Sequence, residues 1–140
     1  MKVLYTAEAL ATGDGRNGRA QTSDRLVDVE LAVPRAMGGS GNGTNPEQLF
    51  AAGYAACFHS ALHLVAREAK ADLGESSVGA QVHIGPNDLG GFGLAVTLEV
   101  VIPDLPHDQA LVLAQKAHQV CPYSNATRGN VNTELKVTND

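Results

Sequence analysis

Residues 44–58 read TNPEQLFAAGYAACF, and this stretch decides the fold because it joins a helix-start signal to a long apolar segment. Thr44 and Glu47 have the S/T-x-x-E spacing of a capping box. Pro46 in the first turn loses only an N–H that would have no partner at a helix start. We therefore expect a central helix that begins here and runs to about residue 70.

Small and apolar residues recur at steps of three and four along this central helix, which is the pattern of a helix packed against a core. Cys57 lies on that stripe. Because a free cysteine packs as a small hydrophobe, the simplest interpretation of Cys57 is a core residue. The stripe consists of Leu49, Gly53, Ala56, Cys57, Ser60, Ala61, Leu64 and Val65.

Length and composition indicate one domain over residues 1–140, with 44% hydrophobic and 18% charged residues. The net charge is −5 and no Lys/Arg cluster offsets it, which argues against nucleic acid or a membrane surface as partner. The chain starts with a charge before any apolar segment, and no uninterrupted apolar run of about 18 residues occurs. We expect a cytoplasmic protein.

Short runs of period-2 alternation predict strands on both sides of the central helix. Strands grouped in runs, with helices packed on one face, indicate an α+β domain with an antiparallel sheet. The glycine-rich segment at 38–43 lacks the lysine of a phosphate-binding loop, so we interpret it as an ordinary connection. The expected strands span residues 1–11, 20–23, 27–33, 77–84, 92–102 and 131–137.

A second helix is expected to begin near Asp104 or Asp108 and to end at Pro122, which directly follows Cys121. Residues 121–130 then form a turn-rich loop. Both cysteines lie on apolar stripes of the two main helices, so packing those stripes against one core would bring them together. A disulfide needs Cα atoms within about 7 Å, which this arrangement allows.

A reactive thiolate at Cys57 needs a nearby cation, because neither cysteine lies at a helix N-terminus. Arg16 and Arg19, in the first turn, are the cations best placed to reach inward, and Glu47 is a carboxylate that can hold one of them in a fork-like pair. Glu47 and Cys57 are ten residues apart, about 15 Å of helix rise. A shared site therefore requires either a helix break near Gly53 or an intertwined homodimer.

His59 and His63 give a rival interpretation, because their i, i+4 spacing places them on one helix face and suits a metal ion. Ser60 follows His59, so the glutamate of an H-E-x-x-H motif is missing. No G-x-S-x-G elbow supports a serine hydrolase. We expect no metal and no cofactor, with a histidine metal site as the weaker alternative.

Four segments closely resemble the organic hydroperoxide resistance proteins, which belong to the superfamily that also holds the osmotically inducible protein C group. They read GRNGR at 15–19, NPEQLFAAGYAACF at 45–58, GGFGL at 90–94 and VCPYSNATRGN at 120–130. The resemblance covers nearly the whole chain. It implies a bacterial, cytoplasmic, thiol-dependent peroxidase that folds as an intertwined α+β homodimer with two active sites at the subunit interface.

The resemblance also implies roles for single residues. Cys57 matches the peroxidatic cysteine and Cys121 the resolving one, while Arg16 and Glu47 match the pair that activates the thiolate. Arg19 is the near neighbour of Arg16. In the resembled family the peroxidatic thiolate becomes a sulfenic acid and then a disulfide with the resolving cysteine, and dihydrolipoamide or a lipoylated protein restores both thiols.

The implied substrates are organic hydroperoxides, alkyl or lipid, which are reduced to alcohols in the response to oxidative stress. We expect an apolar approach lined by residues such as Phe50 and Phe92 to favour these substrates over hydrogen peroxide.

Overall fold

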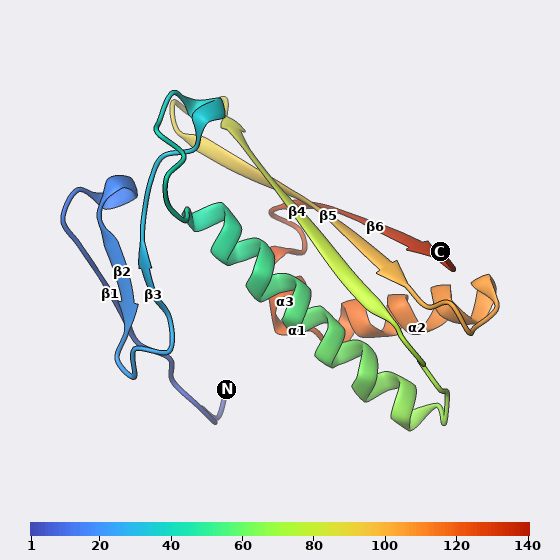
Figure 1. Ribbon diagram of the computed structural model, residues 1–140. Helices are drawn as coiled ribbons and strands as arrows, with labels where there is room; N and C mark the ends of the chain where they lie inside the picture. The colour runs from blue at the N-terminus through green and yellow to red at the C-terminus, as the bar shows by residue number, and fades with distance from the viewer. The chain divides into compact units, whose positions relative to one another are not determined.

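The computed structural model describes residues 1–140, which form two compact units, residues 1–49 and residues 50–140. The architecture is α+β, as the sequence predicts, and Figure 1 follows its elements along the chain. There are two sheets of three strands, one in each unit, where the sequence suggested one sheet. The single-domain interpretation stays a prediction.

The first unit is built on an antiparallel sheet of order β1-β2-β3. The first strand starts only at Ala9 and is shorter than its alternation predicts, although the Ser23 N–H still donates to the Glu8 carbonyl at 3.0 Å. Alternation marks a face of a strand but does not supply a hydrogen-bonding neighbour. The elements of this unit are β1 (Ala9–Thr12), the 3-10 helix η1 (Gly15–Asn17), β2 (Arg19–Thr22), β3 (Asp28–Glu30) and the 3-10 helix η2 (Arg35–Met37).

Backbone hydrogen bonds beyond β3 tie the first turn to the segment that precedes the long helix. The Leu31 N–H donates to the carbonyl of Gly18 at 2.8 Å, and the Thr44 N–H donates to the carbonyl of Glu30 at 2.9 Å. Gly43 permits this approach, because a Cβ at that position would lie 2.8 Å from the Glu30 carbonyl oxygen. The turn and the helix start are thereby fixed to the same stretch of backbone.

The long helix α1 spans Pro46–Glu68 and is continuous, so the break that we considered near Gly53 is absent. Asn45 caps it, with its side-chain oxygen accepting the Gln48 N–H at 2.9 Å. The capping box predicted from Thr44 is therefore wrong by one residue. Pro46 occupies the first helical position, as expected.

The sheet of the second unit is mixed, because its last strand runs parallel to its neighbour. β4 (Ser77–Pro86) and β5 (Phe92–Val101) form the expected antiparallel hairpin. β6 (Asn132–Thr138) pairs with β5 in parallel, so the antiparallel prediction is wrong for this strand. The parallel direction of β6 results from the crossover through α2 (His107–Val120) and α3 (Pro122–Thr127). This crossover returns the chain to the end of the sheet at which β5 also starts.

One face of this sheet carries the core of the second unit. Val96, Leu98 and Val100 alternate on β5 and are buried, and α1 and α2 cover them. Figure 1 shows both helices beside the sheet. By length and composition alone α1 could also cross a membrane, because an 18-residue window within it has a mean hydropathy of 1.4 although its apolar run is interrupted. Its apolar side chains instead contribute to this core.

The buried face of α1 is rotated relative to the predicted stripe. Tyr54, Phe58 and Leu62 are fully buried, whereas Leu64 of the predicted stripe is exposed. The large aromatic side chains remove more apolar surface from water than the small residues of the stripe, so they take the core side. Cys57 is consequently left at the edge of the core and partly exposed.

Candidate active site

Cys57 and Cys121 are free thiols in the second unit, with their sulfur atoms 3.5 Å apart. Cys57 lies within α1, and Cys121 is fully buried at the junction of α2 and α3. Pro122 ends α2, as predicted, yet its ring also suits the first position of a new helix, and α3 starts there. The loop expected over residues 121–130 is therefore in part a short helix.

The electrostatic surroundings of Cys57 within this unit do not favour a thiolate. Burial raises the pKa of the Cys57 thiol, and the neighbouring Cys121 thiol adds to this. A hydrogen bond from the backbone N–H of Tyr123 lowers that pKa and only partly compensates. Tyr123 was not among the residues predicted from sequence, because its contribution comes from the backbone. An additional positive charge is needed to make Cys57 reactive near neutral pH.

A cavity of about 400 Å³ opens beside Cys57, and most of its lining side chains are apolar. Phe50 and Phe92, which we expected to line the approach, do not border it. Phe50 packs against Tyr54 with ring centroids 6.0 Å apart, and Phe92 is exposed at the start of β5. The lining residues are Cys57, Ser60, Ala61, Leu64, Arg67, Val120 and Pro122.

The first unit contains the arginine–glutamate pair anticipated from sequence. Arg16 donates from Nη1 to Glu47 Oε2 at 2.8 Å and from Nη2 to Oε1 at 2.7 Å, a two-point contact between planar groups. The hydrogen bond from Arg16 lowers the pKa of Glu47, and the same contact raises the pKa of Arg16. Both groups are charged at neutral pH. The Arg16 side chain is 37% exposed, which leaves part of its guanidinium free for another partner.

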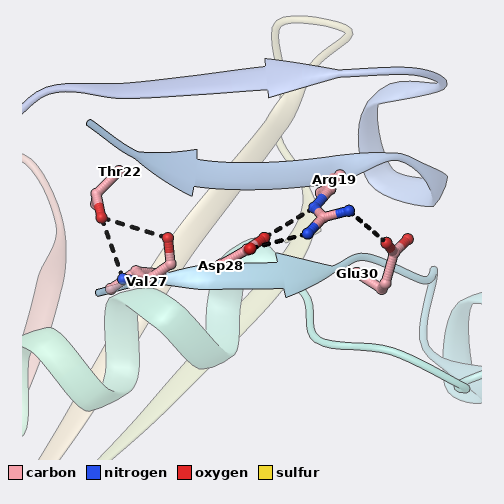
Figure 2. A network of polar contacts seen from close by, with 5 residues as sticks. All are labelled: Arg19, Thr22, Val27, Asp28 and Glu30. Carbon is pink, nitrogen blue, oxygen red and sulfur yellow. Dashed lines mark hydrogen bonds and ion pairs between the residues drawn. The ribbon is translucent and has the colours of Figure 1, made fainter. Parts of the chain in front are cut away.

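Arg19, three residues later, has different partners. It donates from Nε and Nη2 to the carboxylate of Asp28, both at 2.8 Å, and its Nη1 lies 3.5 Å from Glu30 (Figure 2). Asp28 and Glu30 lie on β3, beside β2, and the pairing with Arg19 lowers the pKa of Asp28 to about 2. Arg19 therefore links two strands, while Arg16 binds the start of α1.

His59 and His63 lie together, with ring centroids 4.7 Å apart. His59 Nε2 is 3.0 Å from the Ser76 hydroxyl. No group of three or more His, Cys, Asp or Glu side chains is arranged to hold a metal ion. The histidine metal site thus lacks a third ligand from this chain.

The OsmC-like protein family matches residues 39–136. The organic hydroperoxide resistance protein of Xanthomonas axonopodis pv. citri is 55% identical over 136 residues, 96% of this chain and 94% of that protein. The organic hydroperoxide resistance protein of Elizabethkingia anophelis superposes with a TM-score of 0.95, 51% identity and complete coverage of both chains. A Vibrio cholerae structure with captopril in one of its active sites gives a TM-score of 0.92 and 52% identity, covering 98% of this chain and 94% of that one. The similarity spans both units.

Proposed function

The chain belongs to the OsmC-like family and, within it, to the organic hydroperoxide resistance proteins, and from that premise we propose that it is a thiol-dependent peroxidase that reduces organic hydroperoxides to alcohols. The observation that carries this proposal is the pair of free thiols 3.5 Å apart, one of which borders a partly apolar cavity. Such a cavity suits an alkyl or lipid hydroperoxide better than hydrogen peroxide.

In the proposed first step, the Cys57 thiolate attacks the outer oxygen of the hydroperoxide. The O–O bond breaks, the alkoxide takes a proton and leaves as an alcohol, and Cys57 becomes a sulfenic acid. We assign Arg16 the stabilisation of the thiolate and of the departing oxygen, and Glu47 the task of holding the guanidinium in place. The two-point contact between Arg16 and Glu47 supports that assignment.

In the second step the Cys121 thiol attacks the sulfenic sulfur, a Cys57–Cys121 disulfide forms, and water leaves. An external dithiol, dihydrolipoamide or a lipoylated protein, returns both cysteines to thiols by disulfide exchange. The disulfide is then a transient catalytic bond, which agrees with the cytoplasmic setting and the role in oxidative stress that we infer.

We also infer an intertwined homodimer in which Arg16 of one subunit serves Cys57 of the other. The helix is continuous from Glu47 to Cys57, about 15 Å of rise, so the arginine held by Glu47 needs another route to the sulfur. Within residues 1–49, Ala32 is the only buried apolar residue, which is too little core for that unit by itself. A second subunit supplies both the contact and the missing core.

Activity with a defined reductant tests the proposal. Cumene hydroperoxide and dihydrolipoamide should both be consumed by the wild-type protein, and Cys57→Ser should abolish turnover. Intact mass after one equivalent of peroxide without reductant should fall by about two daltons, with the loss mapping to Cys57 and Cys121. Full activity of Cys57→Ser would rule out this mechanism.

A further inference from the structure

A buried polar network joins α1, which carries Cys57, to α2 and α3, which flank Cys121. The hydroxyl of Ser124 on α3 lies 2.8 Å from the Tyr54 hydroxyl on α1 and 2.8 Å from Nδ1 of His118 on α2. Tyr54 and Ser124 are fully buried. Tyr54 precedes Cys57 by three residues and Ser124 follows Cys121 by three, so a network residue stands within one helical turn of each sulfur.

The polar atoms of this network satisfy one another. The Tyr54 hydroxyl also lies 3.2 Å from Thr127 Oγ1, and the Thr127 hydroxyl donates to the Ser124 carbonyl at 3.2 Å. Burial, and secondarily the charge of Arg128, lowers the pKa of His118 and keeps its ring neutral. One arrangement that fits these distances has the His118 proton on Nε2, so that Nδ1 accepts a hydrogen bond from the Ser124 hydroxyl and the Ser124 oxygen accepts one from the Tyr54 hydroxyl. Fully satisfied buried networks hold their members in one arrangement.

The element held in this way is α3, which starts directly after Cys121, and the Cys121 sulfur lies 3.5 Å from that of Cys57. Cys121 is its N-cap residue, and Tyr123, whose backbone lowers the pKa of Cys57, belongs to its first turn. α3 has only six residues, too few to keep a helix in place without tertiary contacts. The Tyr123 ring packs on Tyr54 with centroids 5.6 Å apart, and a Cβ at Gly53 would lie 3.0 Å from the Tyr123 hydroxyl oxygen.

We propose that Tyr54, Ser124 and His118 are positioning residues that hold Cys121 against Cys57 and so set the rate of disulfide formation. This inference rests on the proposed peroxidase function. The Cys57 sulfenic acid has two fates. Attack by the Cys121 thiol forms the S–S bond and releases water, whereas a second hydroperoxide oxidises the sulfenic acid to a sulfinic acid and leaves as an alcohol. A less firmly held α3 would slow disulfide formation without slowing oxidation to the sulfinic acid.

The ratio of these two products is the measurement. Ser124→Ala and Tyr54→Phe are treated with excess cumene hydroperoxide without reductant, and sulfinic acid at Cys57 is quantified against the disulfide by mass spectrometry. We expect the ratio to rise about tenfold in each variant, as for the loss of one buried hydrogen bond with a partner left unpaired. The double variant should change the ratio by less than the product of the two single effects, because the residues act as a unit.

Thr97→Val is the matched control, because it removes another buried hydroxyl, from β5 in the sheet. Thr97→Val should keep the wild-type ratio of sulfinic acid to disulfide. A general loss of stability would instead raise this ratio in all three variants. Unchanged ratios in Ser124→Ala and Tyr54→Phe, or an equal change in Thr97→Val, would overturn the inference. Tyr54→Phe keeps the bond between Ser124 and His118, so it carries the test if Ser124→Ala does not fold.

Diamide separates this inference from the proposed function. It forms the same disulfide without peroxide, because it accepts the two electrons and two protons of the thiols. Slower closure by diamide in Ser124→Ala and Tyr54→Phe, with Thr97→Val like the wild type, supports the positioning role; equal rates contradict it. A wild-type protein that closes with diamide but consumes no hydroperoxide would instead refute the peroxidase proposal.

Discussion

Residues 1–49 and residues 50–140 differ in how much apolar core and how many ion pairs they contain. The first region buries almost no apolar surface, but it holds the Arg16–Glu47 and Arg19–Asp28 pairs. The second region has a continuous core and both thiols, and its single ion pair is a 4.0 Å contact between Lys136 and Glu134. The difference teaches that burial in the second region raises the pKa of Cys57, and for this reason the proposed mechanism assigns the activating charge to Arg16 of the first region.

The largest expected effect separates the two arginines of the first region. Arg16→Ala should lower kcat/KM for cumene hydroperoxide about 100-fold, as for loss of a preorganised charge at the reacting atoms. Arg19→Ala should cost less than about threefold, because its partners are carboxylates on the neighbouring strand with exposed surroundings. Steady-state kinetics with dihydrolipoamide give both values. Equal losses would show that the two arginines are not distinguished by their partners.

The second prediction concerns the effect of the Arg16 guanidinium on the pKa of Cys57. In a Cys121→Ser background, alkylation of Cys57 by iodoacetamide is followed against pH. Removing Arg16 takes away the cation while burial still raises the pKa of Cys57, so the titration midpoint should move to higher pH. At pH 7 the variant should then react about tenfold more slowly. An unchanged midpoint would mean that Arg16 does not act on the thiolate.

Mixed dimers give a smaller but sharper effect. In the proposed mechanism Cys57→Ser is inactive and Arg16→Ala retains only about a hundredth of the activity, yet one mixed dimer contains an intact arginine and an intact cysteine on opposite subunits. Random exchange should restore about a quarter of wild-type activity, because half of the dimers are mixed and each has one working site. If arginine and cysteine work within one subunit, no activity returns. Two copies of Cys57→Ser mixed with each other serve as the blank.

The smallest expected effect is on acid stability. Arg16 lowers the pKa of Glu47, so the pair stabilises the folded protein above the ordinary glutamate pKa, and this contribution is lost as pH falls through the lowered value. Glu47→Gln removes it. The free energy of unfolding, measured with urea at a series of pH values, should therefore decrease less steeply toward acid pH for Glu47→Gln than for the wild type. Parallel curves would indicate that the pair adds no pH-dependent stability.

The sequence predicted the elements well where a local signal marks them. The long helix, the second hairpin and the stop at Pro122 follow from proline placement and alternation. The residues alone left Arg16 and Arg19 as candidate partners of Glu47, and the resemblance selected Arg16, which pairs with Glu47 across 31 positions. Backbone bonds around Glu30 and Thr44 help to bring these two segments together. A charged residue in a turn and an opposite charge at a helix start can therefore be proposed as partners from the sequence.

Other features could not be read from the sequence because tertiary contacts decide them. Thr44 and Asn45 are both good capping residues, and the bond from Thr44 to Glu30 leaves the cap to Asn45. Pro122 stops one helix and starts another, which a turn-rich composition does not reveal. Leu64 lines the cavity instead of the core because Tyr54 and Phe58 occupy the inner side of α1. The parallel direction of β6 depends on where the crossover returns.

The 3.5 Å separation of the two sulfur atoms has a kinetic consequence. A disulfide bond is about 2.05 Å long, so closing it requires a shift of only about 1.5 Å and no refolding of α1 or α2. A reactant held in such contact behaves as though it were present at a very high effective molarity, far above that of any dissolved peroxide. In the proposed mechanism this contact gives Cys121 an advantage over a second hydroperoxide molecule when the substrate concentration rises suddenly.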